Sequence, residues 1–130
     1  MSLLKISKLH TLKFALIFGA TVLVAGQASA APALAIFEGF VGYDTLKASM
    51  LNEAKSEVDT VLTGKATSGD LNNMCVVYAL SKDYVAAESS CFDAITKAKE
   101  ENVSRQTLKM MKSNLKIVTQ QIQDYSSAAD

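Results

Sequence analysis

Histidine and tryptophan are the clearest absences from this sequence of 130 residues. Tryptophan does not occur, and the single histidine, His10, lies within the first thirty residues. Histidine is the commonest general base in enzymes and the commonest protein ligand of transition metals. Beyond the first thirty residues, the chain therefore has no histidine to act as a general base or to bind a transition metal.

Proline and strand-forming patterns are also scarce. The only proline is Pro32, and only two of the six glycines lie beyond Gly42. The sequence has no runs in which β-branched or aromatic residues alternate with polar ones, the pattern typical of half-buried strands. Helical spacing of apolar residues extends instead through nearly the whole chain. The sequence therefore predicts an all-α fold.

The first thirty residues have the pattern of a secretory signal peptide. Three lysines and no acidic residue precede an apolar run at 14–26, and a small-x-small cleavage pattern ends at Ala30. A membrane-spanning helix needs about 20 apolar residues, which is longer than this run. We therefore expect cleavage after Ala30, a periplasmic or secreted location, and no stable membrane span in the processed chain.

The processed chain is expected to be small and weakly acidic. The leader at 1–30 contains three of the 13 basic residues and none of the 13 acidic ones, so the remainder has a net charge of −3. Nucleic-acid binding requires a basic surface, and we expect no such partner. The length suits one domain, which we place at 31–125 and follow with a frayed tail at 126–130.

Cys75 and Cys91 are the only two cysteines. Their separation does not match the C-x-x-C spacing of redox motifs or zinc sites. Two thiols in a small exported domain most often form a structural disulfide. We predict this bond, with two free buried thiols or a redox pair as the alternatives.

Apolar spacing and the positions of breaks divide the chain into helices. The first predicted helix buries Phe37, Phe40 and Val41, and tight corners are expected at 49–50 and 81–83. A clear break separates the second helix from the third at 64–69. The five predicted helices span about 34–48, 52–63, 70–80, 84–99 and 104–125.

The second and fourth predicted helices can be superposed with an offset of 33 residues. Small and apolar residues agree at seven pairs of positions: Val41 with Met74, Gly42 with Cys75, Leu51 with Tyr84, Ala54 with Ala87, Val58 with Cys91, Val61 with Ala94, and Leu62 with Ile95. A period of about 20 to 50 residues built from helix pairs is typical of a solenoid.

Residues 73–87 (NMCVVYALSKDYVAA) resemble the first helix, the corner and the start of the second helix of a tetratricopeptide repeat. The matching positions are Met74 for the usual leucine, Cys75 for the small residue, Tyr78 for the aromatic residue, Asp83-Tyr84 for the helix-opening pair, and Ala87 and Ala94 for the packing alanines. Residues 41–62 match more weakly, which gives about two repeats.

The chain departs from the family pattern at several positions. Ser49 and Lys82 occupy corners where the family often has glycine, and Lys99 stands where it often has proline. Thr45 occupies a position that is usually aromatic. The alternative to the family fold is an unrelated small helical bundle with alanine-rich contacts.

The resemblance implies a non-catalytic protein that binds an extended peptide or a partner helix in a groove lined by the first helix of each repeat. Asn72 or Asn73 is suited to hydrogen bonding with a peptide backbone. The implied peptide-binding residues are Tyr43, Lys47, Asn72, Asn73, Val76 and Ala79. The alternative is that these are ordinary exposed residues of a two-helix layer.

The fifth predicted helix has a heptad seam formed by Leu108, Met111, Leu115, Val118, Ile122 and Tyr125, with Asn114 on the polar side. The seam would either cap the second repeat or pair with another copy in a homodimer. Two repeats are too few to close a core by themselves, which favours the cap.

Other candidate chemistry is weaker. Ser81-Lys82, or Ser113 with a neighbouring lysine, would suit only an outlying small hydrolase, because nothing places a lysine in an apolar pocket. Methionines at helical spacing indicate core packing more often than a copper(I) site. The sequon Asn102-Val103-Ser104 is equally consistent with a turn in which the asparagine or the serine caps the fifth helix. We expect no metal, no cofactor and no catalysis.

Overall fold

The computed structural model describes residues 20–23 and 33–130, and the predicted cleavage site after Ala30 lies outside these residues. The described part is predominantly helical, as predicted. Its elements are β1 (Ala20–Leu23), β2 (Leu34–Phe37), α1 (Tyr43–Lys47), α2 (Leu51–Asp59), the 3-10 helix η1 (Thr63–Lys65), α3 (Ser68–Leu80), α4 (Tyr84–Glu100) and α5 (Arg105–Ala128).

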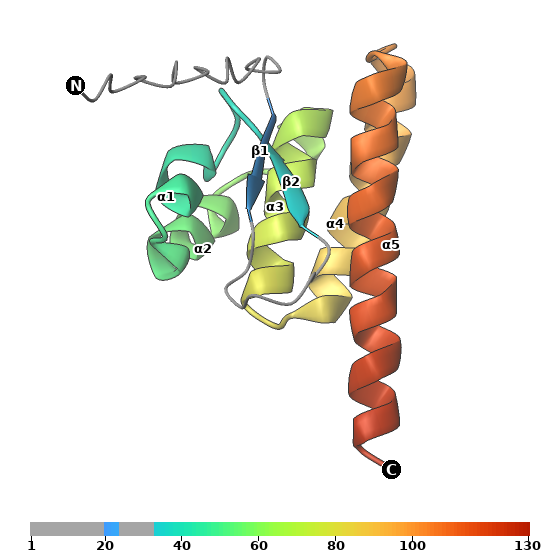
Figure 1. Cartoon of the computed structure of the whole chain (residues 1–130). Coiled ribbons are helices and arrows are strands. Elements are labelled where there is room, and N and C mark those ends of the chain that lie inside the picture. Colours follow the sequence, from blue (N-terminus) through green and yellow to red (C-terminus); the bar gives the residue numbers. More distant parts are fainter. Residues whose placement is uncertain (1–19, 24–32) are drawn as a thin grey trace, which may run out of the picture.

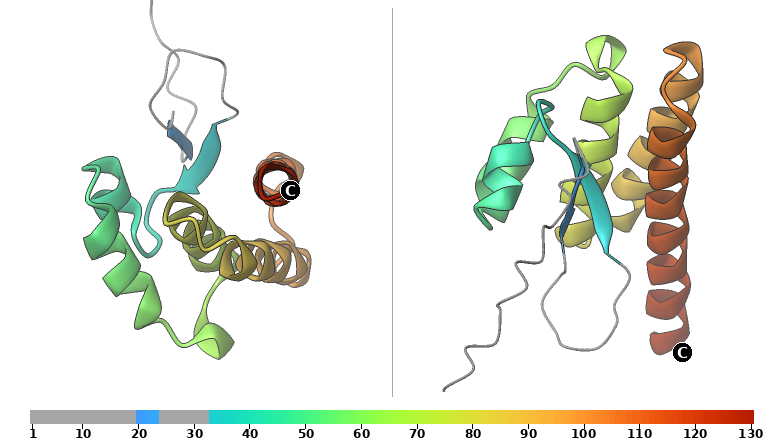
Figure 2. Two further views of the ribbon diagram at one scale, coloured as in Figure 1. Left: turned by 90° about the horizontal axis from the view of Figure 1, so that it is seen from below. Right: turned by 45° about the horizontal axis from the view of Figure 1, so that its top comes forward.

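Helix α3 is the centre of the fold and packs against α2, α4, α5 and β2. Strand β2 lies between the α1–α2 pair and α5, as Figures 1 and 2 both show. The long helix α5 runs beside α4 and also contacts β2. It covers the end of the helical array within one chain, which is the capping arrangement predicted from the sequence.

Small residues form the contacts between the helices. Ala54, Ala87 and Ala94 have no exposed surface, and Gly42 is buried beside Val58. Side chains of this size allow helix axes to approach closely. Small residues therefore occupy the inner faces of this part of the fold.

Side chains fix the starts of the three longest helices. Thr67 and Asp70 form a reciprocal capping box at the start of α3. The Asp83 carboxylate accepts a hydrogen bond from the backbone N–H of Ala86 at 3.2 Å in the first turn of α4. Ser104 caps α5 by accepting from the N–H of Thr107 at 3.1 Å, as the capping interpretation of the sequon predicts.

Helices α1, α3 and α4 all end in the same way. Ser49, Lys82 and Asn102 follow their last turns with left-handed φ angles of 60°, 62° and 53°. In each case this residue and the next donate their N–H groups to carbonyls three and five residues back, at 2.8–3.3 Å. This is the Schellman motif. Because Ser49 and Lys82 are 33 residues apart, the first two corners recur at the spacing found in the sequence.

Glycine at the first two corners should stabilise the protein. A left-handed backbone is unfavourable for most L-residues and accessible to glycine, so we expect Ser49→Gly and Lys82→Gly each to add about 0.5–1 kcal/mol to the free energy of unfolding. Asn102→Gly should add less, because asparagine tolerates this region. Urea denaturation of the three variants tests the expected order, and a loss of stability at Lys82→Gly would contradict it.

The predicted helix at 34–48 is wrong over its first part. Residues 34–37 form β2, and the chain then turns at Gly39 and Gly42, whose φ angles are 85° and 74°. Side chains of α3 and α5 form hydrogen bonds with backbone N–H and C=O groups of β2. Residues 34–37 therefore do not need the hydrogen bonds of a helix. Phe37 is buried as predicted, whereas Phe40 is exposed.

Strand β1 was not predicted either. It lies inside the apolar run at 14–26 and pairs antiparallel with β2, with Thr21 opposite Ile36 and Leu23 opposite Leu34. Apolar runs of this kind do not distinguish a strand from a helix by periodicity alone. The pairing partner on β2 decides the conformation here.

Helix boundaries also differ from the predictions. Helix α2 stops at Asp59, so Leu62 is 67% exposed although its repeat partner Ile95 is buried. The repeat therefore fails at its last pair. Helix α3 starts two residues earlier than predicted, at Ser68, and α5 continues into the predicted tail as far as Ala128.

The buried stripe of α5 is rotated from the predicted seam. Met111 and Val118 are buried as predicted, but Leu115 is only half-buried and Tyr125 is exposed. Asn114, predicted on the polar side, has no exposed surface. Its hydrogen bonds to β2 and α3, described below, account for this position.

The predicted disulfide between Cys75 and Cys91 is confirmed. The bond joins α3 to α4, and the two Cα atoms are 5.0 Å apart. Both residues are buried between these two helices. The cross-link therefore lies in the core of the second helix pair.

Candidate functional site

Three buried asparagines hold the backbone of β2. Asn72 and Asn73 come from α3 and Asn114 from α5, and none of them has exposed surface. Their side-chain amides approach the edge of β2 that faces these two helices. We call these three residues the asparagine clamp.

Two members of the clamp bind β2 through both ends of the amide. Asn73 Oδ1 accepts from the N–H of Phe37 at 2.8 Å, and Asn73 Nδ2 donates to the Phe37 carbonyl at 2.9 Å. Asn114 binds Ala35 in the same way. Its Oδ1 accepts from the N–H of Ala35 and its Nδ2 donates to the Ala35 carbonyl, both at 2.8 Å. A side-chain amide carries a donor and an acceptor, so it substitutes for a residue of a neighbouring strand.

Asn72 links the two sides of the clamp. Its Nδ2 donates to the Ala35 carbonyl at 2.9 Å, and its Oδ1 accepts from Asn114 Nδ2 at the same distance. The carbonyl of Ala35 thus uses two donors. A buried polar network of this kind is stable only when its members are satisfied, and these bonds satisfy the facing groups of β2.

Side chains also bind the backbone just after β2. Asn73 Nδ2 reaches the Val41 carbonyl at 3.2 Å, and the Asp70 carboxylate accepts from the Val41 N–H at 3.0 Å. The Glu57 carboxylate accepts from the N–H of Gly42 at 3.2 Å. Side chains of α2, α3 and α5 therefore bind the main chain of β2 and of the turn that follows it, at residues between Ala35 and Gly42.

The structure brings together four of the six predicted peptide-binding residues. Asn72, Asn73, Val76 and Ala79 all lie buried on α3, where the two asparagines bind the chain's own backbone. The other two lie on α1: Tyr43 is buried, and Lys47 is exposed with its Nζ 5.6 Å from the Tyr43 ring centre. Binding of a separate partner at these residues stays a prediction.

Sequence reasoning missed Asn114 as a member of this site. The signal was present, since Met111, Asn114 and Val118 follow the same 3-4 spacing as a buried stripe. Because asparagine is polar, Asn114 was predicted to lie on the solvent side of the helix. A polar residue at core spacing on a helix requires a buried partner, and here that partner is a strand distant in sequence.

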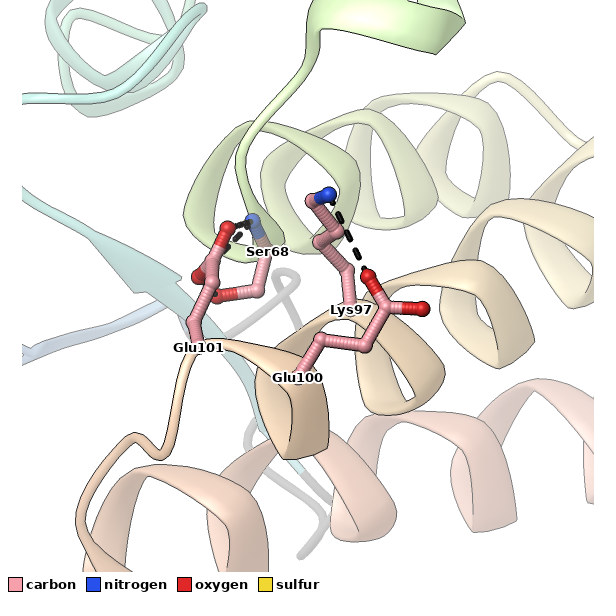
Figure 3. A network of polar contacts seen from close by, with 4 residues as sticks. All are labelled: Ser68, Lys97, Glu100 and Glu101. Atoms are coloured by element: carbon pink, nitrogen blue, oxygen red, sulfur yellow. Dashed lines mark hydrogen bonds and ion pairs between the residues drawn. The ribbon is translucent and has the colours of Figure 1, made fainter.

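A carboxylate from the end of α4 binds the start of α3. Glu101 accepts hydrogen bonds from the N–H of Ser68, at 3.1 Å, and from its hydroxyl, while Lys97 pairs with Glu100 at 3.2 Å (Figure 3). The start of a helix favours negative charge because its first N–H groups lack partners in the helix. The contact therefore ties the C-terminal end of α4 to the N-terminal end of α3.

Asp59 and Tyr78 connect α2 to α3. The Tyr78 hydroxyl donates to Asp59 Oδ1 at 3.0 Å, and Lys55 pairs with Asp59 at 2.9 Å. Hydrogen bonds from Lys55 and Tyr78 lower the pKa of Asp59. Burial, followed by the hydrogen bond to Asp59, raises the pKa of Tyr78. Both shifts stabilise the ordinary neutral-pH forms, a carboxylate and a protonated phenol, which suits a structural contact.

An apolar surface lies along α4 and α5. Val85, Phe92 and Tyr125 are 82%, 63% and 71% exposed, and the half-buried Leu115 and Ile122 line the same hollows. Two hollows of the surface meet at Val85, one lined by Phe92 and Leu115 and the other by Ile122 and Tyr125. We call these five residues the α4–α5 patch.

Comparison with known proteins gives no match to a family model, to a curated protein or to a solved structure. Within residues 20–23 and 33–130, no helix has the length and apolar character needed to cross a membrane. In the same part of the chain, no three His, Cys, Asp or Glu side chains are grouped to hold a metal ion.

Proposed function

We propose that this chain is an exported, non-catalytic helical-repeat protein that binds a protein or peptide partner in the periplasm or outside the cell. The observation that carries the proposal is the asparagine clamp. It holds an extended segment by both its N–H and C=O groups, which is how a protein recognises a peptide main chain whatever the side chains are.

The repeated corner supports the tetratricopeptide-like part of the proposal. The left-handed residues Ser49 and Lys82 recur with matching hydrogen bonds, and Ala54 and Ala87 recur as fully buried contacts at the same spacing. Repeated helix pairs of this kind form concave surfaces that bind partners.

The candidate catalytic pairs support a non-catalytic function. Lys82 is exposed at a helix corner, and Lys112 and Ser113 are exposed on α5. A lysine that acts as a general base needs a desolvated site, whereas these side chains lie at the solvent surface.

Two measurements on the exported protein test the proposal. Its mass should place the N-terminus at Ala31, because the charged start, apolar run and small-x-small site direct cleavage there. A photoreactive residue at the exposed Lys47 should then cross-link one partner of defined mass in the export compartment. The matched control is Lys109 on α5. An unprocessed chain, or equal labelling at both positions, would contradict the proposal.

Self-association is a second candidate function, favoured by the α4–α5 patch. Large exposed apolar residues grouped on one surface are typical of interfaces. If two copies pair through this patch, Phe92→Asp and Leu115→Asp should give folded monomers from a dimeric parent, because neither side chain is fully buried within the chain.

Sedimentation and circular dichroism of these variants test the dimer. Asn52→Asp is the matched control, since Asn52 is exposed on α2, outside the α4–α5 patch. It should leave the oligomeric state unchanged. A wild-type protein that sediments as a monomer at all concentrations would remove this candidate.

A further inference from the structure

Strand β2 has two hydrogen-bonding edges, and different parts of the chain occupy them. Ala35 and Phe37 direct their N–H and C=O groups to the asparagine clamp. Successive residues of a strand direct these groups to opposite edges, so Leu34 and Ile36 face the other way, toward β1. Strand β1 pairs with them through Leu23 and Thr21.

The second edge depends on the leader. β1 lies at residues 20–23, upstream of the expected cut after Ala30, so this step rests on the processing that forms part of the proposed function. Cleavage removes β1 and leaves the groups of Leu34 and Ile36 without that partner. An unpaired strand edge is a template for another extended chain.

We propose that this edge of β2 is a binding site in the processed protein, and that it accepts an extended apolar segment of a partner protein as an antiparallel strand. The occupant replaces β1. It pairs its own N–H and C=O groups with those of Leu34 and Ile36, completing the two-stranded sheet.

The chemistry of the occupant follows from β1 and its surroundings. The edge is filled by ATVL, four uncharged residues that are small, β-branched or aliphatic, and the four residues of β2 are apolar and buried. Backbone pairing supplies affinity in strand addition, while the side chains set the preference. We therefore assign a segment of about four such residues, without charge.

A partner strand fits this edge better than a second copy of the chain. Helices α1 and α2 flank β2 on one side and α5 flanks it on the other (Figure 2). Two copies that paired through β2 would have to bring these flanking helices together as well. A single extended segment needs only the space along the strand that β1 occupies.

The test uses the processed protein recovered after export, with its N-terminus verified at Ala31, and the peptide GATVLV, which has the sequence of residues 19–24. Amide hydrogen exchange is followed by NMR. Saturating peptide should slow exchange at Leu34 and Ile36 by at least about tenfold. Exchange at Ala35 and Phe37 should stay unchanged, because the asparagine clamp already holds these amides.

Backbone methylation of the peptide supplies the matched control. Thr21 and Leu23 lie opposite Ile36 and Leu34, so N-methyl groups at these two residues should abolish the effect. An N-methyl group at Val22 should be tolerated, since its N–H points away from β2. Equal effects of the two methylated peptides, or no slowing with GATVLV, would overturn the inference.

Three further outcomes relate this inference to the proposed function. Protection of Leu34 and Ile36 that rises with protein concentration in the absence of peptide would assign the edge to a second copy and overturn the partner strand. An exported chain that retains β1 would overturn both proposals. A processed chain that cross-links its partner through residue 47 but does not bind GATVLV would overturn only the inference about β2.

Discussion

Replacing Asn114 by leucine should lower the free energy of unfolding by about 2–5 kcal/mol, because the change leaves two buried polar groups without partners. The N–H of Ala35 loses its acceptor, and Asn72 Oδ1 loses the donor that lies 2.9 Å away. The carbonyl of Ala35 keeps its bond from Asn72. Leucine has the same number of side-chain heavy atoms as asparagine, but its methyl groups are bulkier, so crowding at this fully buried position adds to the loss of hydrogen bonds.

Urea denaturation of Asn114→Leu and of Gln123→Leu tests this expectation. Gln123 is exposed on the same helix, and its replacement should change stability by less than about 0.5 kcal/mol. Exchange at the Ala35 amide should also become faster in Asn114→Leu only. Equal stabilities of the two variants would show that the asparagine clamp contributes nothing to the position of β2.

Reducing the Cys75–Cys91 disulfide should lower the free energy of unfolding by about 3 kcal/mol. The bond closes a loop between residues 16 apart, and a loop of about this size restricts the unfolded chain by that amount on the entropy model. The total stability of a small domain is about 5–15 kcal/mol. The cross-link therefore supplies a large share of the stability of the protein.

Denaturation with and without reductant measures this effect. The double variant Cys75→Ala, Cys91→Ala is the control, because its stability should not respond to reductant. Thiol labelling of the unreduced, denatured protein should find no free cysteine. Two labelled thiols in protein taken from the export compartment would contradict the prediction.

The asparagine clamp and the disulfide act on different contacts. The disulfide joins two helices that are consecutive in the chain and already share a tightly packed interface. The clamp joins β2 to side chains on α3 and α5, and the sequence separation between the bonded residues is 36 to 79 positions. Loss of the clamp should therefore loosen the N-terminal segment while the α3–α4 pair remains helical.

Local sequence determined the long helices and the corners between them. Apolar residues at steps of three and four specify α4 and most of α5, and Asp83 and Ser104 supply caps at their starts. The 33-residue spacing indicated a repeated corner that the structure shows at Ser49 and Lys82. These features depend on residues within one or two turns of one another, so a single sequence contains them. The pairing of Cys75 with Cys91 followed from having only two cysteines.

Tertiary structure alone decided the N-terminal segment and the orientation of α5. Residues 34–37 are apolar without a distinguishing period, and they become a strand because β1 on one edge and three asparagines on the other satisfy their backbone groups. Asn114 is buried for the same reason, although its polarity assigns it to the surface. Hydrogen bonds between distant residues override local propensity in a buried site, since unpaired backbone groups there cost more than propensity gains.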